Sequence, residues 1–164
     1  MAPRITAATL ADAPAIARIV SESNRDVAVQ FGLDATNCPK HPSFCTPDWV
    51  EADFARGERY FLLEDRDGPM ACVAYESPNP DVAYLNRLSV LPAARRQGLG
   101  QALVAHVLAL ARSDAKKAVS IGVIGEHVAL QAWYRRLGFR DGDTKRFAHL
   151  PFSVKYMAHP LDAG

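Results

Sequence analysis

The sequence predicts a mixed α/β fold, with a central and mostly antiparallel sheet of about seven strands flanked by helices. The first half contains strand-like segments joined by short turns, which is typical of antiparallel hairpins. The second half alternates apolar strand segments with segments of helical spacing, which is typical of βαβ units. The chain of 164 residues is long enough to bury one sizeable core, so we expect a single domain over residues 1–164.

Composition narrows the class of protein. The formal net charge is +1, which argues against a broad nucleic-acid-binding surface. The N-terminus has no signal-peptide pattern, and charges interrupt every apolar run before membrane-spanning length. Three cysteines do not suggest a disulfide framework. We therefore expect a cytoplasmic protein with no membrane or nucleic-acid partner.

Local patterns place the elements in order. Apolar alternation or continuous apolar runs predict strands at 4–8, 59–64, 70–76, 82–90 and 116–124, with weaker candidates at 139–140, 146–150 and 152–157. Helical spacing and capping residues predict helices starting after Asp12, from about Thr46 to Gly57, from Leu99 to about Ser113, and over 128–137. The segment 26–31 is ambiguous and can continue the first helix, while 32–47 is a proline-rich loop.

The strand 82–90 leads through a basic, glycine-containing turn directly into a helix. A helix N-terminus offers unpaired N–H groups and the positive end of the dipole, which together favour an anion such as phosphate. Gly98 and Gly100 allow a ligand close to the backbone, and Arg95 and Arg96 add positive charge. A Walker A loop is disfavoured because Gly100 is not followed by Lys-Ser/Thr, and a dinucleotide-binding turn lacks its third glycine. A solvated surface turn is the remaining alternative.

Two motifs give this turn a family resemblance. Arg95-x-x-Gly98-x-Gly100 resembles the coenzyme A pyrophosphate motif of the GNAT family of N-acyltransferases. Downstream, the segment 131–139, Gln-Ala-Trp-Tyr-Arg-Arg-Leu-Gly-Phe, resembles the Leu-Tyr-x-x-x-Gly-Phe segment of that family. The motifs have the family's order and spacing, and the predicted element order matches the GNAT fold over nearly the whole chain.

The resemblance implies acetyl-CoA as co-substrate. It assigns the pantetheine amides to the strand around Leu88, Ser89 and Val90, which can pair with an extended ligand as an added strand does. It assigns the pyrophosphate to the turn and first helical residues Arg95, Arg96, Gln97, Gly98, Leu99, Gly100 and Gln101.

Catalytic candidates follow from the chemistry of thioester aminolysis, which needs a neutral amine and a proton donor for the leaving thiolate. Tyr134 matches the family's tyrosine acid, with core packing as the alternative. Many members carry a carboxylate near Asn86, and an amide cannot replace it as a base. Glu76 and His127 are the candidate bases; a solvated strand-end carboxylate and a helix cap are their alternatives.

The loop 32–47 is the most individual part of the chain. Cys38, His41 and Cys45 have spacing that a zinc ion can use, but without a second cysteine pair we expect buried cysteines and no metal. We assign recognition of the acceptor to the aromatic residues in and around this loop, Phe31, Phe44 and Trp49.

The leading hypothesis is an acetyl-CoA-dependent N-acetyltransferase that acts on a primary amine of a small molecule or peptide. The alternative is a non-catalytic acetyl-CoA-binding sensor, which the missing carboxylate at Asn86 favours. Homodimers are common in the family, so a homodimer is an open expectation.

Overall fold

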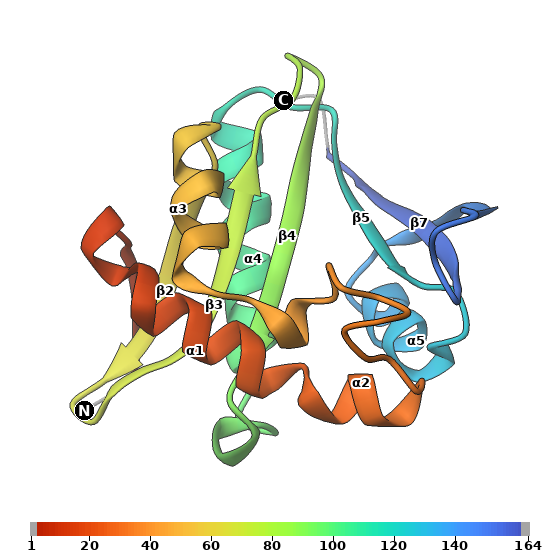
Figure 1. Cartoon of the computed structure of the whole chain (residues 1–164). Coiled ribbons are helices and arrows are strands. Elements are labelled where there is room, and N and C mark those ends of the chain that lie inside the picture. Colours follow the sequence, from red (N-terminus) through yellow and green to blue (C-terminus); the bar gives the residue numbers. More distant parts are fainter. Residues whose placement is uncertain (1–2, 162–164) are drawn as a thin grey trace.

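The computed structural model describes residues 3–161 and contains a seven-stranded mixed sheet with the order β1-β2-β3-β4-β5-β7-β6. Neighbouring strands are antiparallel except β4 and β5, which are parallel. This architecture confirms the predicted mixed, mostly antiparallel sheet with flanking helices (Figure 1). No helix in the described part of the chain has the length and apolar character needed to span a membrane.

The elements of the first half agree closely with the sequence patterns. They are β1 (Arg4–Ala7), α1 (Ala13–Ser23), α2 (Arg25–Gln30), α3 (Pro47–Ala55), β2 (Arg59–Asp65), β3 (Gly68–Glu76) and β4 (Val82–Val90). The ambiguous segment forms a separate short helix, α2, because Asn24 breaks the helical geometry and its side chain bonds back to the carbonyl of Val20 at 2.7 Å. The proline-rich loop contains one short 3₁₀ turn, η2 (Pro42–Phe44).

The second half contains α4 (Leu99–Ser113), β5 (Ala118–Ile124), α5 (Val128–Arg136), β6 (Arg140–Arg146) and β7 (Ser153–Pro160). The strand candidate 146–150 was wrong, and the candidates at 139–140 and 152–157 had the wrong extents. Every residue of β6 is exposed and its sequence is polar, so no apolar alternation marks it. Pairing with β7 at the sheet edge defines this strand.

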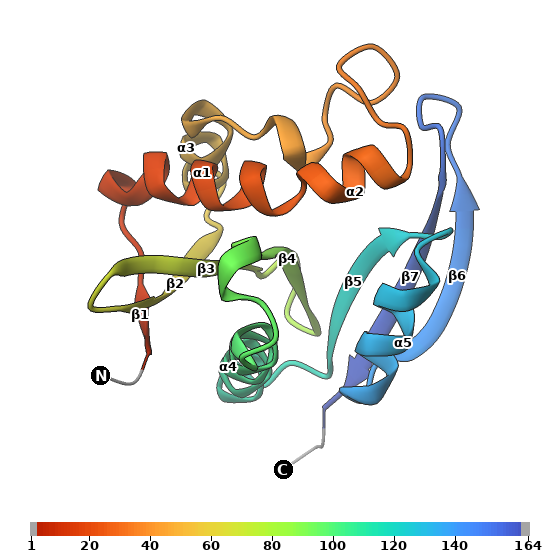
Figure 2. The same cartoon turned by 90° about the horizontal axis from the view of Figure 1, so that it is seen from below.

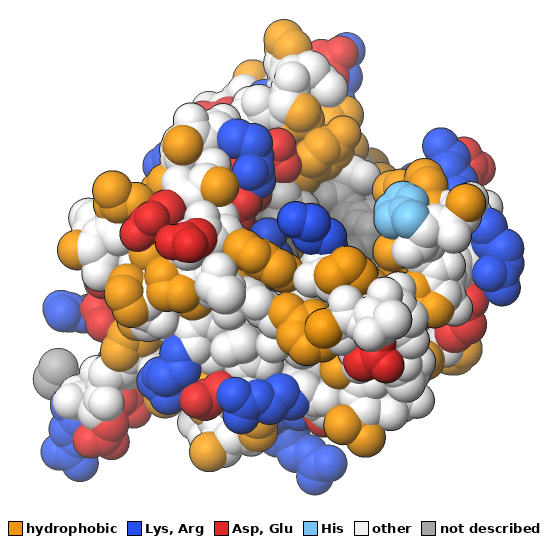
Figure 3. Space-filling view, in the orientation of Figure 1, with side chains coloured by type: hydrophobic (Ala, Val, Ile, Leu, Met, Phe, Trp, Pro, Cys, Tyr) orange, Lys and Arg blue, Asp and Glu red, His pale blue; other side chains and the backbone are white. Residues whose placement is uncertain are grey.

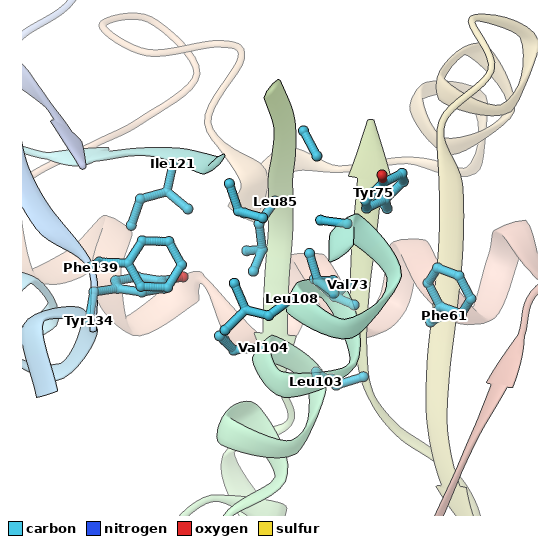
Figure 4. Close-up of a cluster of buried hydrophobic side chains, with 14 of the residues drawn as sticks. Phe61, Val73, Tyr75, Leu85, Leu103, Val104, Leu108, Ile121, Tyr134 and Phe139 are labelled. Carbon is cyan, nitrogen blue, oxygen red and sulfur yellow. The ribbon is translucent and has the colours of Figure 1, made fainter. Parts of the chain in front are cut away.

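The helices cover the sheet from both sides. Helices α1 and α3 lie on one face, while α4 and α5 lie on the other (Figure 2). The larger core packs α4 and α5 against the sheet and includes Leu85, Leu103, Ile121 and Tyr134 (Figure 4). Cys72 is fully buried in the smaller core under α1, as the apolar strand around it predicted.

The parallel strands β4 and β5 separate part-way along their length. They pair only from Val82 with Ala118 to Tyr84 with Ser120. Beyond Tyr84 the β5-facing edge of β4 has no strand partner among residues 3–161, so its backbone groups are open to a ligand. Figure 1 shows the two strands diverging, and residues of both strands line the cavity of the candidate site.

Candidate functional site

A cavity of about 540 Å³ lies where β4 and β5 separate. Its wall includes residues 85–88 of β4 and 120–124 of β5, together with side chains from α2, the loop 32–47, α5 and β7. The space-filling view shows this face hollowed, with a basic side chain in the hollow (Figure 3). We call residues 85–88 the β4 wall, and His127, Leu130 and Tyr134 the α5 wall.

Tyr134 belongs to the α5 wall and is 5% exposed. Its ring packs edge-to-face against Trp133 and Phe139, which fixes its orientation. Figure 4 shows the hydroxyl oxygen directed toward β4. The hydroxyl has no hydrogen-bond partner among the described residues, and burial raises its pKa, so it stays protonated.

Asn86, on the β4 wall, links two carboxylates. Its Nδ2 donates to Glu58 Oε1 at 3.0 Å and to Glu76 Oε1 at 2.9 Å. Glu58 is 4% exposed, and burial raises its pKa despite the hydrogen bond from Asn86. A carboxylate pair therefore lies directly behind the residue at which the family resemblance led us to look for a base.

A second buried carboxylate, Asp53, organises the residues behind Arg87. Asp53 Oδ2 accepts from the Tyr60 hydroxyl at 2.5 Å and from Arg87 Nε at 3.0 Å, and Oδ1 accepts from Arg56. Burial alone would raise the pKa of Asp53, but the bonds from Tyr60 and Arg87 outweigh it and hold the pKa below its usual value. Arg56 also bonds Glu58 at 2.9 Å, so the two carboxylate groups form one network.

His127 caps α5 and lies in the cavity wall. Its ring centroid is 5.3 Å from that of Phe31, and burial lowers its pKa, so the imidazole is neutral near pH 7. Its Nδ1 is buried with no hydrogen-bond partner in the described structure. Such an atom indicates a place where a ligand or water completes the hydrogen bonding.

The loop 32–47 contributes His41 to the cavity. His41 is 5% exposed, and its Nδ1 contacts Ser43, lying 3.2 Å from the backbone nitrogen and 2.7 Å from Oγ. Cys38 and Cys45 pack in different apolar clusters, and burial raises both thiol pKa values. Within residues 3–161 no three His, Cys, Asp or Glu side chains form a group suited to a metal ion.

The glycine turn has the geometry of an open helix N-terminus. Gly98 is the N-cap of α4 with φ of +76°, a left-handed conformation that favours glycine. No side chain caps this end, so the first N–H groups of α4 are available to a ligand. Arg96 is exposed at φ of +66°. Arg95 instead bonds Asp26 at 2.6 Å and the carbonyl of Ser23 at 2.6 Å, which ties the turn to α1 and α2.

Some of the other predicted site residues line the cavity and some do not. Leu88 lines the cavity, while Ser89 is buried and bonds Asn24 and the carbonyl of Arg87. The cavity wall among the described residues does not include Phe31, Phe44 or Trp49, although Trp49 lies against Arg87, with the guanidinium 5.6 Å from the ring centroid.

Sequence reasoning missed Glu58, Arg87 and the orientation of His41. Glu58 lies just before β2 and Arg87 lies within β4, and at both positions a solvated charge is the ordinary interpretation. The one available signal was the pair Asn86-Arg87, two strongly polar residues in succession within a mostly apolar strand.

Comparisons with known proteins identify the fold and the family. The alanine N-acetyltransferase of ribosomal protein bS18 from Escherichia coli (strain K12) is 33% identical over 101 residues, which cover 60% of this chain and 68% of that protein. The crystal structure of the corresponding Escherichia coli enzyme has a TM-score of 0.78 at 19% identity, covering 99% of this chain and 96% of that one. The PaiA N-acetyltransferase of Thermoplasma acidophilum, solved with coenzyme A, has a TM-score of 0.83 at 13% identity and covers 98% and 100%.

The family model of the acetyltransferase (GNAT) family matches residues 29–139, a range that includes both sequence motifs and most of the cavity wall. The chain therefore belongs to the acetyltransferase (GNAT) family and is an acetyltransferase.

Proposed function

We propose that this enzyme transfers the acetyl group of acetyl-CoA directly to a primary amine. The observation that carries the proposal is the cavity between the separated strands, which has a protonated Tyr134 hydroxyl on one side and a carboxylate pair behind Asn86 on the other. Aminolysis of a thioester requires a proton donor and a proton acceptor, and the two walls supply one each.

Features of the chain fit acetyl-CoA. The open edge of β4 near Leu88 suits the extended, amide-bearing pantetheine, and the uncapped N-terminus of α4 suits the pyrophosphate. The unpartnered Nδ1 of His127 suits a polar group of the same ligand, so we assign His127 to binding. Bound acetyl-CoA supplies the acetyl group as a thioester that an amine can attack.

Tyr134 serves the leaving group. As the bond between the amine nitrogen and the acetyl carbon forms and the carbon–sulfur bond breaks, the sulfur takes up negative charge. The Tyr134 hydroxyl has no protein partner to satisfy, so it is free to donate its hydrogen bond and proton to that sulfur. Its proton is then replaced from solvent.

The carboxylate pair serves the amine. Asn86 lines the cavity but cannot take a proton, whereas Glu58 and Glu76 directly behind it can. The raised pKa of Glu58, caused mainly by burial, makes it a better match for proton transfer near neutral pH. We assign the base to this pair, with a water molecule connecting it to the amine and the half-buried Glu76 as the exit toward solvent.

The experiment is a screen of primary amines with acetyl-CoA, following release of free thiol and identifying products by mass spectrometry. We expect thiol release that depends on the amine and a product heavier by one acetyl group. Saturable acetyl-CoA binding without amine-dependent thiol release across a broad panel would contradict direct transfer and favour a binding module.

A further inference from the structure

We propose that the acceptor amine carries a carboxylate close to its amino group. Asn86 on the β4 wall binds the amino group, and Arg87 beside it binds the carboxylate. The inference rests on the proposed function, because it names the class of acceptor for the same cavity. It comes from four features of the structure: a bulge in β4, a fixed amide, an unsatisfied guanidinium and a buried histidine.

The bulge places two consecutive side chains on the same side of the sheet. In a regular strand, Asn86 and Arg87 would point to opposite faces. Here the register between β3 and β4 shifts between Cys72 and Ala74, and Arg87 has φ of +53°, which is rare for a residue with a side chain. As a result Asn86 reaches Glu58 and Arg87 reaches Asp53, both in the network beside α3. Backbone strain of this kind is concentrated at functional sites.

Asn86 is oriented as a hydrogen-bond acceptor toward the ligand. Two carboxylates accept from the same side-chain atom of Asn86, so that atom is the amide nitrogen and the other is Oδ1. Oδ1 accepts no hydrogen bond from the described residues, and Asn86 lines the cavity. An amine or ammonium group is the partner that this oxygen lacks.

Arg87 offers hydrogen-bond donors beside it. Its Nε bonds Asp53, and Asp53 is itself fixed by Tyr60 and Arg56. The two Nη groups have no hydrogen-bond partner in residues 3–161, while the Arg87 side chain is only 22% exposed and lines the cavity. Two parallel N–H donors of a guanidinium match the two oxygens of a carboxylate.

The surroundings of Arg87 favour an anion further. Trp49 lies 5.6 Å from the guanidinium and 5.9 Å from Lys40 Nζ, so the loop 32–47 brings a second cation to this region. His41 lines the same cavity, and in the tautomer whose Nδ1 accepts from the backbone N–H of Ser43, its Nε2–H is a further donor. Donors that converge from two segments of the chain call for a ligand with acceptor oxygens.

An amine with a carboxylate nearby satisfies both residues at once. Two sources share this chemistry: the α-carboxylate of a free amino acid and the acidic side chain of a peptide whose N-terminal amine reacts. A neutral peptide N-terminus or a simple amine would leave the Nη groups of Arg87 without a charged partner, and such a ligand loses the stronger, charge-assisted bonds.

The test compares kcat/KM for amino acids and for their C-terminal amides with acetyl-CoA and the full chain. We expect the wild-type enzyme to prefer the acid, and Arg87→Gln to lower the acid-to-amide ratio about tenfold to a hundredfold, the loss expected for charge-assisted hydrogen bonds. To separate the sources, C-terminally amidated alanyl-glutamate and alanyl-glutamine are compared in the same way.

Arg56→Gln is the matched control. Arg56 bonds the same Asp53 but is largely exposed and does not line the cavity, so its loss disturbs the network without removing the proposed anion site. We expect the acid-to-amide ratio to be unchanged in this variant. If Arg87→Gln fails to fold because Asp53 loses a partner, Arg87→Lys keeps the charge and removes the paired donors, and we expect the same direction of change.

Equal turnover of acids and amides by the wild-type enzyme, or equal ratios in wild type and Arg87→Gln, would overturn the inference while leaving the proposed function intact. If no amine reacts at all, the proposed function fails, and calorimetry with N-acetylalanine and its amide on the CoA-loaded protein decides the inference separately. Arg87-dependent binding of the acid would support the anion site. Absence of that binding would overturn it.

Discussion

The two walls of the cavity satisfy their polar groups in opposite ways. On the β4 wall, Asn86 and Arg87 are held by buried carboxylates and each keeps only part of its hydrogen-bonding capacity free. On the α5 wall, no residue within 3–161 makes a hydrogen bond to the Tyr134 hydroxyl, and the Nδ1 of His127 is in addition fully buried. Because an unsatisfied buried polar group costs free energy, the Nδ1 of His127 makes the α5 wall depend on a ligand or a water molecule.

This contrast suggests a division of labour. A group that the protein holds rigidly is suited to selecting an acceptor amine by its shape and charge. A group that the protein leaves free is suited to a partner present in every reaction cycle, which here is acetyl-CoA. Substitutions on the α5 wall should therefore change steps that involve the cofactor, and substitutions on the β4 wall should change steps that involve the amine.

The largest effect is expected for Tyr134→Phe. Removing the hydroxyl leaves the aromatic packing against Trp133 and Phe139 in place but removes the proton donor, so kcat should fall about a hundredfold. Binding of acetyl-CoA, measured by calorimetry, should be retained. A kcat close to that of wild type would remove Tyr134 from the mechanism.

Tyr75→Phe provides the matched control for a lost tyrosine hydroxyl. Tyr75 is buried in the same core and bonds Asp114 at 2.7 Å, away from the cavity wall. We expect a stability loss of about 1 kcal/mol with kcat unchanged. A fall in kcat as large as that of Tyr134→Phe would show that general core damage explains both variants.

Behind the β4 wall, Glu58→Gln should lower kcat about tenfold, since Glu76 remains and the amide can still accept from Asn86. In wild type, burial raises the pKa of Glu58, and we expect this group to set the acidic limb of the pH profile of kcat. Because Glu58→Gln removes that group, the acidic limb should move to lower pH. Glu76→Gln, measured alongside, should also lower kcat, since it removes the other carboxylate that Asn86 bonds. An unshifted limb in Glu58→Gln would assign the base to another group.

A smaller effect is expected for His127→Leu. Loss of one hydrogen bond to the cofactor should raise KM for acetyl-CoA about threefold to tenfold and leave KM for the amine unchanged. This is the reverse of the pattern expected for Arg87→Gln. Steady-state titration of both substrates measures the two values, and an equal rise in both would contradict the division between the walls.

Local sequence patterns explain why the fold and the segment proposed to bind acetyl-CoA could be predicted. The strand, the turn at Gly98 and the helix from Leu99 are contiguous, and the alternation and periodicity that define them are visible within a short window. The polar β6 gave no such pattern and was misplaced, because only its pairing with β7 makes it a strand.

The acceptor side could not be predicted because its contacts are remote in sequence. Glu58 is 28 residues from Asn86, and Asp53 is 34 residues from Arg87. An isolated charged residue in a sequence is ordinarily solvated, and nothing local marks the one that folding buries. The bulge at Arg87 is likewise a product of sheet packing, so the strand pattern predicted opposite faces for two residues that share one.

The smallest expected effect concerns stability. Because burial raises the pKa of Glu58 in the folded state, folding favours its protonated form, and the stability linked to this proton is present at low pH and lost as pH rises through the folded pKa. Glu58→Gln removes that loss, so its free energy of unfolding relative to wild type should increase from pH 4 to pH 7, by about 1 kcal/mol. Urea denaturation at a series of pH values measures the difference. The exposed Glu51→Gln on α3 is the control for loss of a carboxylate at the surface, and we expect its free energy of unfolding to stay close to that of wild type. A relative stability of Glu58→Gln that falls with pH would mean that the network holds Glu58 ionised, and the β4 wall would then present a fixed charge in place of a base.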